Sequence, residues 1–382
     1  MSQKDISRKD PDVLIVGGGT AGLFVALFLA QAGIRTLLVE RHRAPLAHPR
    51  AMEIGPRTVE LLRTAGLADA VDAECIDMTG GKLQTLSASV LSEADLAGFS
   101  RRVPPRADAF RDLTSQTLRG ICPQDRLDRV VAEAAQAAGA QLAFATELMS
   151  FAQDDEGVIA RLGGVDGTYG YEVRVRYLVA ADGARSSTRE ALGIGNSGPG
   201  ALGDPLISVL FQADFTDPTR ALPFIVRDST TPNASSGLQP VDGEGKWIYR
   251  FHYAPSAGQT AEHFTPERCA DQIRAAVAPG SKLPLRIVSV LPWQVQGLVA
   301  DRFRSGRVFL AGDAAHVFPP VGTFGIDTGV SDAYNLAWKL AHVLQGKAGE
   351  GLLDSYDDER RPTAELLLKQ LVLRLEDPAL PR

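Results

Sequence analysis

Residues 12–40 read DVLIVGGGTAGLFVALFLAQAGIRTLLVE, and this stretch decides the fold. A short β-branched run is followed by a glycine-rich turn, by an apolar helical pattern that ends at Gly33, and by a second apolar run that ends at Glu40. Short apolar runs bounded by glycine are typical of buried strands, and the segment between them has the length of one helix. The stretch therefore predicts a βαβ unit whose first turn is rich in glycine.

The glycines of this turn have the spacing of a dinucleotide-binding site. Gly17, Gly19 and Gly22 follow the pattern GxGxxG between a strand and a helix, and Glu40 ends the next strand. Glycine lets the backbone turn tightly and approach a pyrophosphate, whose charge is stabilised at the helix N-terminus. A carboxylate at the end of the second strand accepts hydrogen bonds from ribose hydroxyls. The pattern alone leaves NAD, NADP and FAD open.

The rest of the chain predicts two structural regions. Alternating helix and strand patterns continue to about residue 190, with helices over 56–71 and 123–138 and a strand over 174–183. From about 200 to 295, strand-like stretches are broken by Pro, Gly and Ser. We therefore predict an α/β fold in which a Rossmann-like domain (1–195 and 296–382) carries an inserted, mainly antiparallel β substrate domain (196–295).

Composition excludes several classes of protein. The 382 residues have a net charge of -6, without the basic excess that nucleic-acid binding needs. Three widely spaced cysteines and six histidines show no disulfide or metal-site spacing, so we expect no metal. The N-terminus is polar, and the apolar run after it is interrupted by glycines. We therefore expect neither a signal segment nor a membrane span, and a cytoplasmic protein.

Two further motifs narrow the choice of dinucleotide. DGARSSTR occupies 182–189, and RVFLAGDAAHVFPPVGTFGIDTG occupies 307–329. Together with GxGxxG they resemble the three signatures of the class A FAD-dependent aromatic monooxygenases, the family of para-hydroxybenzoate hydroxylase, and are closest in pattern to the polyketide aromatic hydroxylases. PRA (49–51), PQDRLDRV (123–130), DAYNLAWKLA (332–341) and YDDERRP (356–362) resemble further family segments in family order, so the resemblance covers nearly the whole chain.

The resemblance implies a cofactor and a reaction. The family binds FAD non-covalently, takes electrons from NADPH or NADH, and adds O2 to the reduced flavin at C4a, so that the resulting hydroperoxide hydroxylates an aromatic or polycyclic phenolic substrate. Because the flavin carries the chemistry, no catalytic side chain is assigned. Two alternatives stay open: Baeyer-Villiger-type oxygen insertion on the same fold, and a flavin-bound protein that binds a ligand without oxygenating it. We expect a monomer or homodimer.

Family roles carry over onto matching residues. Glu40 is expected to hold the adenosine ribose, Arg41 and Gln124 to lie along FAD, and Asp313 to bind the ribityl chain beside Gly312, whereas His316 is expected to be structural. Asp182 and Gly183 belong to a motif that supports the pyrophosphate region and nicotinamide binding, with Arg189 as an ordering partner, and Arg50 is expected near the mobile flavin. The expected cofactor residues are Gly17, Gly19, Thr20, Ala21, Gly22, Glu40, Arg41, Arg50, Gln124, Asp182, Gly183, Gly312, Asp313, Pro320, Gly322, Gly325 and Ile326.

The inserted sheet is expected to select the substrate. Alternation along 246–254 places Trp247, Tyr249 and Phe251 on one face, which either covers the flavin or fills the core under the sheet. The candidate substrate residues are Phe224, Leu238, Trp247, Tyr249, Phe251 and Trp293.

The chain departs from the family pattern PxGGxGxN at two positions. Thr323 replaces a glycine, and Asp327 replaces an asparagine. Asp327 precedes a helical pattern, so it either caps that helix or places a carboxylate near the flavin pyrimidine.

Overall fold

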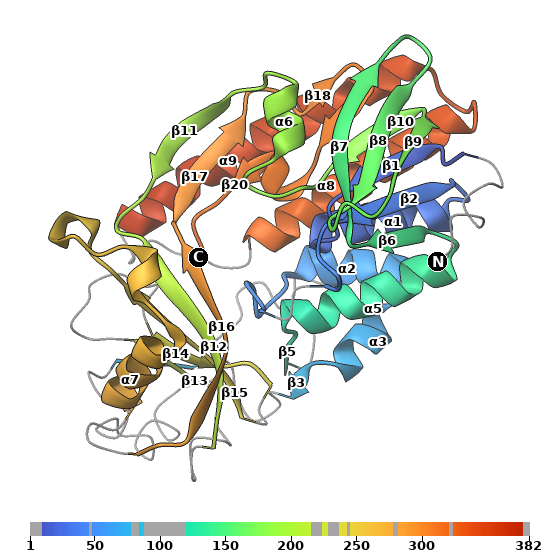
Figure 1. Ribbon diagram of the computed structural model, residues 1–382. Coiled ribbons are helices and arrows are strands. Elements are labelled where there is room, and N and C mark those ends of the chain that lie inside the picture. Colours follow the sequence, from blue (N-terminus) through green and yellow to red (C-terminus); the bar gives the residue numbers. More distant parts are fainter. Residues whose placement is uncertain are drawn as a thin grey trace.

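The structure is a computed structural model that describes residues 10–45, 48–77, 84–87, 120–214, 224–227, 237–242, 245–277, 282–320 and 324–376 (Figure 1). Its centre is a six-stranded sheet in which β1 lies between β2 and β10. Five of its strands are parallel, and β18 pairs antiparallel with β19. In order, the strands are β18 (Arg304–Ser305), β19 (Val308–Leu310), β10 (Tyr177–Ala180), β1 (Val13–Val16), β2 (Thr36–Glu40) and β6 (Gln141–Phe144).

Both faces of this sheet are covered, as the unbroken apolar runs of its strands require. One face packs against helix α1 (Thr20–Gln31), which contacts α5 (Gln124–Ala137) and α8 (Phe324–Leu344). The other face carries an antiparallel sheet whose inward residues join the same core. That sheet contains β7 (Thr146–Gln153), β8 (Val158–Gly164) and β9 (Gly170–Val175).

The helix expected over 56–71 is instead two helices, α2 (Pro56–Thr64) and α3 (Ala68–Ala73). Gly66 between them has φ +75°, a left-handed conformation that ends the first helix. The remaining helices of the described ranges are α6 (Ser187–Ala191), α7 (Pro266–Val277) and α9 (Ser355–Glu376), with short 3-10 turns η2 (Pro255–Ala257), η3 (Ala261–His263), η4 (Gly312–Ala314) and η5 (Glu350–Leu353). Among the described helices, none combines the length and apolar content needed to cross a bilayer.

A second six-stranded sheet lies apart from the first, at the lower left of Figure 1. Its order is β16 (Leu285–Trp293), β12 (Leu206–Ala213), β15 (Lys246–His252), β14 (Gly237–Pro240), β13 (Phe224–Arg227) and β4 (Gln84–Ser87). The first four pairings are antiparallel, and only β4 pairs parallel, with β13. The expected class, an α/β fold with a mainly antiparallel second sheet, is confirmed.

The second sheet does not coincide with the expected insert. Strand β4 forms the edge of this sheet, where it pairs parallel with β13, although it lies far upstream of residue 196 in the sequence. At the start of the expected insert, β11 (Asn196–Ala201) pairs instead with β17 (Gln296–Ala300), which also pairs with β20 (His316–Val317). A small ladder of β3 (Ile76–Asp77) and β5 (Gly120–Ile121) completes the described strands.

Candidate active site

The glycine-rich turn after β1 has a packed side and an open side. Gly17 has φ +108°, and a Cβ there would lie 2.2 Å from the carbonyl oxygen of Ala181. A Cβ on Gly22 would lie 2.0 Å from the oxygen of Gly17, so both glycines are required by the turn itself. Gly19, the N-cap of α1, is exposed, and a Cβ there would meet no atom within 4 Å. The open N-terminus of α1 therefore fits an anionic group such as a pyrophosphate.

A chain of hydrogen bonds supports this helix N-terminus. Gln124 accepts from the backbone N–H groups of Arg50 and Ala51, both at 3.3 Å, and donates to Thr20 Oγ1 at 2.9 Å. Thr20 in turn donates to Asp128 Oδ1 at 2.6 Å. Three of the expected cofactor residues are thus brought together, and the chain ends on a buried carboxyl that sequence reasoning missed.

Asp128 is a buried carboxyl group that contacts Thr20, the first residue of α1. Burial, reinforced by the charge of Asp125, raises its pKa from 3.8 to about 7, although hydrogen bonds from Thr20 and Gln124 work in the opposite direction. A signal was present in the sequence, because Asp128 lies on the apolar stripe of α5 that includes Leu127 and Val131.

Glu40 joins the end of β2 to the glycine turn. Its Oε2 accepts from the Gly18 N–H at 2.6 Å, and its Oε1 accepts from the His42 N–H at 2.8 Å. The His42 Nδ1 lies 2.5 Å from the same Oε1. Gly18 and His42 were not singled out from the sequence, and Arg41 between Glu40 and His42 is exposed.

The DG motif and the GD motif are tied together by Arg189. This buried side chain donates from Nη1 to the carbonyl oxygens of Ala184 (3.3 Å) and Ala314 (3.1 Å). Asp182 Oδ2 accepts from the N–H and hydroxyl of Thr188, but Asp182 Oδ1 is buried with no hydrogen-bond partner among the described residues. A buried oxygen in that state needs a donor from elsewhere, which is consistent with a bound polar cofactor.

Gly312 and Asp313 lie at the carboxyl end of β19. Gly312 has φ +60°, and a Cβ there would lie 2.7 Å from the Cβ of Ala21, so the missing side chain lets the turn pack against the start of α1. Asp313 is about half exposed, and its Oδ2 lies 4.0 Å from Nη1 of the exposed Arg50. Asp313 and Arg50 therefore face each other from separate segments of the chain.

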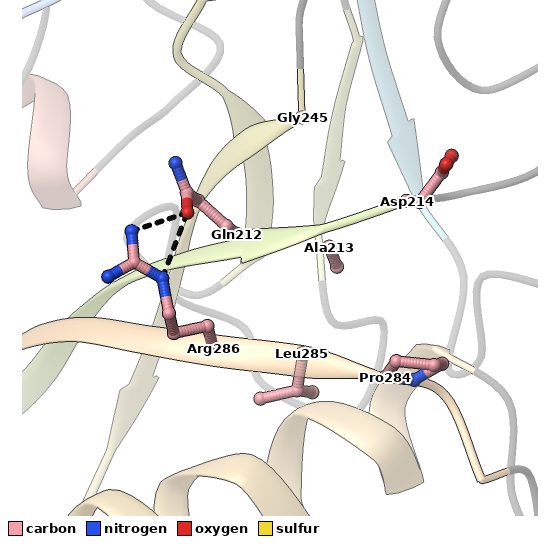
Figure 2. Close-up of a pocket in the computed structure, with 7 residues that line it drawn as sticks. All are labelled: Gln212, Ala213, Asp214, Gly245, Pro284, Leu285 and Arg286. Atoms are coloured by element: carbon pink, nitrogen blue, oxygen red, sulfur yellow. Dashed lines mark hydrogen bonds between the residues drawn. The ribbon is translucent and has the colours of Figure 1, made fainter.

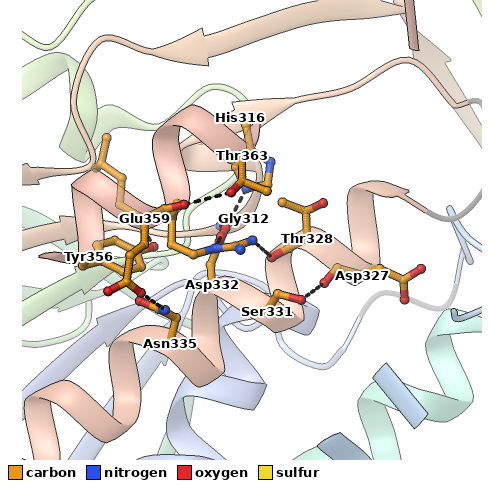
Figure 3. Close-up of polar contacts among 12 residues, drawn as sticks. Gly312, His316, Asp327, Thr328, Ser331, Asp332, Asn335, Tyr356, Glu359 and Thr363 are labelled. Atoms are coloured by element: carbon orange, nitrogen blue, oxygen red, sulfur yellow. Dashed lines mark hydrogen bonds and ion pairs between the residues drawn. The ribbon is translucent and has the colours of Figure 1, made fainter. Parts of the chain in front are cut away.

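A buried ion-pair cluster holds this turn from behind (Figure 3). Asp332 Oδ2 lies 2.6 Å from His316 Nε2 and accepts from the Gly312 N–H at 3.2 Å, and Asp332 Oδ1 accepts from Arg360 Nε at 2.7 Å. Burial alone would raise the pKa of Asp332, but the charges and hydrogen bonds of His316 and Arg360 hold it below its usual value. His316 thus has the structural environment expected of it, and Asp332 and Arg360, which sequence reasoning missed, complete the cluster.

Asp327 contacts a different helix from its own. Its carboxylate accepts from the Gly55 N–H at 2.8 and 3.0 Å and from Thr58 Oγ1 at 2.5 Å. Gly55 is the N-cap of α2, so Asp327 supplies from α8 the capping group that α2 lacks. Neither expected role describes this contact. Gly325 and Ile326 lie in the same turn of α8 and Pro320 is exposed, whereas Gly322 and Thr323 lie outside the described residues.

The expected substrate face of the second sheet is turned away from the cofactor side. Trp247, Phe251 and Leu238 are buried in a core with Cys269 and Ile273 of α7, and Tyr249 packs against it. Of the two alternatives that the sequence left open for this face, the structure supports the one in which it fills the core under the sheet. Alternation shows which residues share a face, but the amphipathic helix α7 decides which face is covered.

The opposite face is directed toward the first sheet and its loops. Its Leu210 and Ile248 pack against Met52 and Ile121, which are close in sequence to the hydrogen-bonded residues Ala51 and Gln124. Trp293 is partly exposed and pairs with Leu206 at the end of this face. Phe224 lies in β13, and its side chain is outside the described set.

His48 links the two layers at this face. Its Nδ1 lies 2.6 Å from Ser289 Oγ, and its Nε2 lies 2.9 Å from Ser208 Oγ. Burial, followed by the charges of Arg250 and Arg50, lowers the pKa of His48 from 6.5 to about 4, so the ring is neutral at pH 7.

These features define a dinucleotide-binding flavoprotein fold with a second sheet set against the cofactor side. Residues 10–370 match the family described as FAD binding domain. The chain belongs to this family, within the class A FAD-dependent aromatic monooxygenases. The expectations of an FAD cofactor and of a FAD-dependent monooxygenase are therefore confirmed.

The chain is also similar in sequence and structure to proteins named as hydroxylases and monooxygenases. The chain is 43% identical over 378 residues to a tetracenomycin B2 monooxygenase-dioxygenase of Streptomyces olivaceus, covering 96% of this chain and 69% of the relative. It is 43% identical over 359 residues to a putative polyketide hydroxylase of Streptomyces halstedii, covering 92% and 63%. A crystal structure of aklavinone-11 hydroxylase with FAD and aklavinone superposes with a TM-score of 0.81 at 38% identity, covering 96% of this chain and 68% of that one. The chain thus spans about two thirds of the length of these proteins.

Proposed function

We propose that this chain uses NADPH or NADH and O2 to hydroxylate an aromatic, polycyclic phenolic substrate. The observation that carries the proposal is the inner face of the second sheet, which contacts residues 48–52 beside the open N-terminus of α1. A ligand between them would be enclosed by the sheet on one side and by the cofactor on the other. The relatives named above are a tetracenomycin B2 monooxygenase-dioxygenase, a putative polyketide hydroxylase and an aklavinone-11 hydroxylase, which supports a polyketide-derived ring system. The three cysteines, all within the described residues, form no disulfide, which favours work in a reducing cytoplasm.

The described residues fit FAD at several points. We assign the pyrophosphate to the N–H groups at the start of α1 beside Gly19, because that is the open side of the turn. Glu40 and the orphaned oxygen of Asp182 are the acceptors placed for hydroxyl or N–H donors of the nucleotide. Asp313 and Arg50, exposed and facing each other, are assigned to the ribityl and ring end of the cofactor.

The protein's part in the reaction is to bind, orient and exclude water. When bound, FAD supplies the electron transfer and the oxygen chemistry. Leu210 and Ile248 are buried against Met52 and Ile121, so the contact between the sheet and this loop is apolar and helps to exclude water from the enclosure. His48 stays neutral and fixes the sheet to the loop that carries Arg50, so the enclosure has a constant geometry.

The decisive experiment follows NADPH oxidation and product mass with the purified holoprotein and a panel of polycyclic phenols, under ¹⁸O2. We expect substrate-stimulated NADPH oxidation and a product heavier by one ¹⁸O atom on an aromatic carbon. Insertion of that atom beside a ketone would assign the Baeyer-Villiger alternative. A protein that binds FAD and the phenols but consumes no NADPH would be the non-oxygenating binding protein.

A further inference from the structure

The inner face of the second sheet carries a cationic group that none of the established roles uses. Arg250 and Ile248 are two residues apart on β15, so they share the face that packs toward Met52 and Ile121. The same register places Arg250 opposite Ser208, whose hydroxyl contacts His48. Arg250 is therefore directed into the space between the sheet and the cofactor layer.

The guanidinium of Arg250 has few protein partners. Its Nη1 donates to Gln239 Oε1 at 3.2 Å, and this is the one hydrogen bond that it forms with the part of the chain the structure describes. It forms no ion pair with any carboxylate in the same ranges. A guanidinium carries five N–H donors, so most of those of Arg250 have no acceptor among the described residues.

Other arginines of the described core are satisfied in a different way. Arg360 pairs with the Asp332 carboxylate, and Arg189 is held by two backbone carbonyl oxygens. Taking a guanidinium partly out of water without an anionic partner costs free energy. Burial lowers the pKa of Arg250 to about 10, so the side chain is still charged at neutral pH. The neighbouring His48 is no counter-ion either, because its protonated form would add a second positive charge, and burial together with the charge of Arg250 lowers the pKa of His48 to about 4.

We propose that Arg250 is a specificity-determining residue that binds an anionic oxygen, carboxylate or phenolate, on the aromatic substrate. Arg binds carboxylates in a bidentate, charge-assisted geometry, and it binds a phenolate oxygen through the same fork of donors. The hydrogen bond to Gln239 Oε1 orients the guanidinium of Arg250. The proposal deepens the proposed hydroxylase function and rests on it only for the identity of the ligand as a substrate.

The experiment measures binding to the oxidised holoprotein from the change in flavin absorbance, so it needs no turnover. The probes are two matched pairs, anthraquinone-2-carboxylate with its methyl ester and 2-hydroxyanthraquinone with 2-methoxyanthraquinone, titrated at a pH where each acid is ionised. The wild type should prefer the anion in at least one pair, and the pair that shows the preference identifies the carboxylate or the phenolate as the group bound. Arg250→Gln should weaken binding of that anion by about 10- to 100-fold while leaving its neutral partner within about twofold.

Two further variants separate binding from folding. Arg250→Lys should retain part of the preference, because it keeps the charge without the fork. Arg286→Gln is the matched control: Arg286 lies on β16 of the same sheet and donates from Nε and Nη2 to Gln212 Oε1 at 3.0 and 2.6 Å. It lines a separate cavity of about 400 Å³ where β12 ends and β16 begins (Figure 2), so it should change neither pair.

The outcomes are decisive in both directions. A wild type with no preference for either anion, or an Arg250→Gln variant that weakens acid and neutral partner equally, overturns the subsite. Failure of the hydroxylase proposal appears separately, as absence of NADPH-dependent product while the anion preference persists.

Discussion

Asp128→Asn tests whether the carboxyl under the start of α1 is protonated at neutral pH. Its pKa in the folded protein is about 7, against 3.8 for the ordinary group. Between these values the folded state binds a proton that the unfolded state has lost, so the free energy of unfolding falls as pH rises through this window. At 1.36 kcal/mol for each of about 3 pKa units, the full loss is at most about 4 kcal/mol by pH 8.

Asparagine has the shape of the protonated acid, and its oxygen can still accept from Thr20. We therefore expect the variant to be more stable than the wild type by about 2 kcal/mol at pH 5, where the unfolded carboxyl is already ionised, and by about 4 kcal/mol at pH 8. Urea unfolding of holoprotein at fixed excess FAD, repeated across this pH range, gives both curves. Glu133→Gln, an exposed carboxylate on the same helix, is the control and should leave the pH dependence of the wild type unchanged. Parallel curves for wild type and Asp128→Asn would refute the reasoning.

Four further predictions concern single positions. Gly19→Ala should leave the apoprotein folded, since its Cβ meets no protein atom, but should weaken FAD binding at least 10-fold, because that Cβ would enter the open side of the turn assigned to the pyrophosphate. Gly22→Ala should prevent folding, because its Cβ would lie 2.0 Å from a backbone oxygen. Equal melting temperatures of the two apo-variants would contradict this. Glu40→Ala should weaken FAD binding by about 1 to 3 kcal/mol in a fluorescence titration, and unchanged affinity would remove its assignment. Because the pKa of His48 falls from 6.5 to about 4 on folding, the wild type should lose about 3 kcal/mol of unfolding free energy as pH drops through that range, and His48→Gln should flatten the curve. Asp327→Ala should destabilise the protein by about 1 to 2 kcal/mol with an unchanged flavin potential, and a raised potential would restore the view that this carboxylate acts on the flavin.

Features with a local cause were predictable from the sequence. Gly22 follows from a contact within one turn, since its Cβ would lie 2.0 Å from the Gly17 oxygen, and the strands that flank the turn could be recognised from their own apolar runs. The motif that begins at Asp182 was assigned to the cofactor from its resemblance to the family pattern, and that assignment stays a prediction.

Features that depend on distant partners were not predictable in the same way. Nothing in residues 246–252 shows that α7 covers the face of Trp247, and nothing near Gln84 shows that this segment pairs with β13. His48 was considered only as a metal ligand, since its two serine partners lie 160 and 241 residues away along the chain. Asp327 was assigned to its own helix or to the flavin because its contact with α2 joins segments more than 260 residues apart.

The make-up of the second sheet bears on attempts to exchange substrate specificity between relatives. A chimera that replaced only residues 196–295 would keep one parent's edge strand, β4, and the same parent's His48, while taking Ser208 and Ser289 from the other. Its new sheet would meet a foreign edge and a foreign bridging residue. Crossover points that carry residues 48–87 together with 196–295 keep both contacts within one parent, so libraries built from these two blocks should yield more folded recombinants than libraries built from either alone.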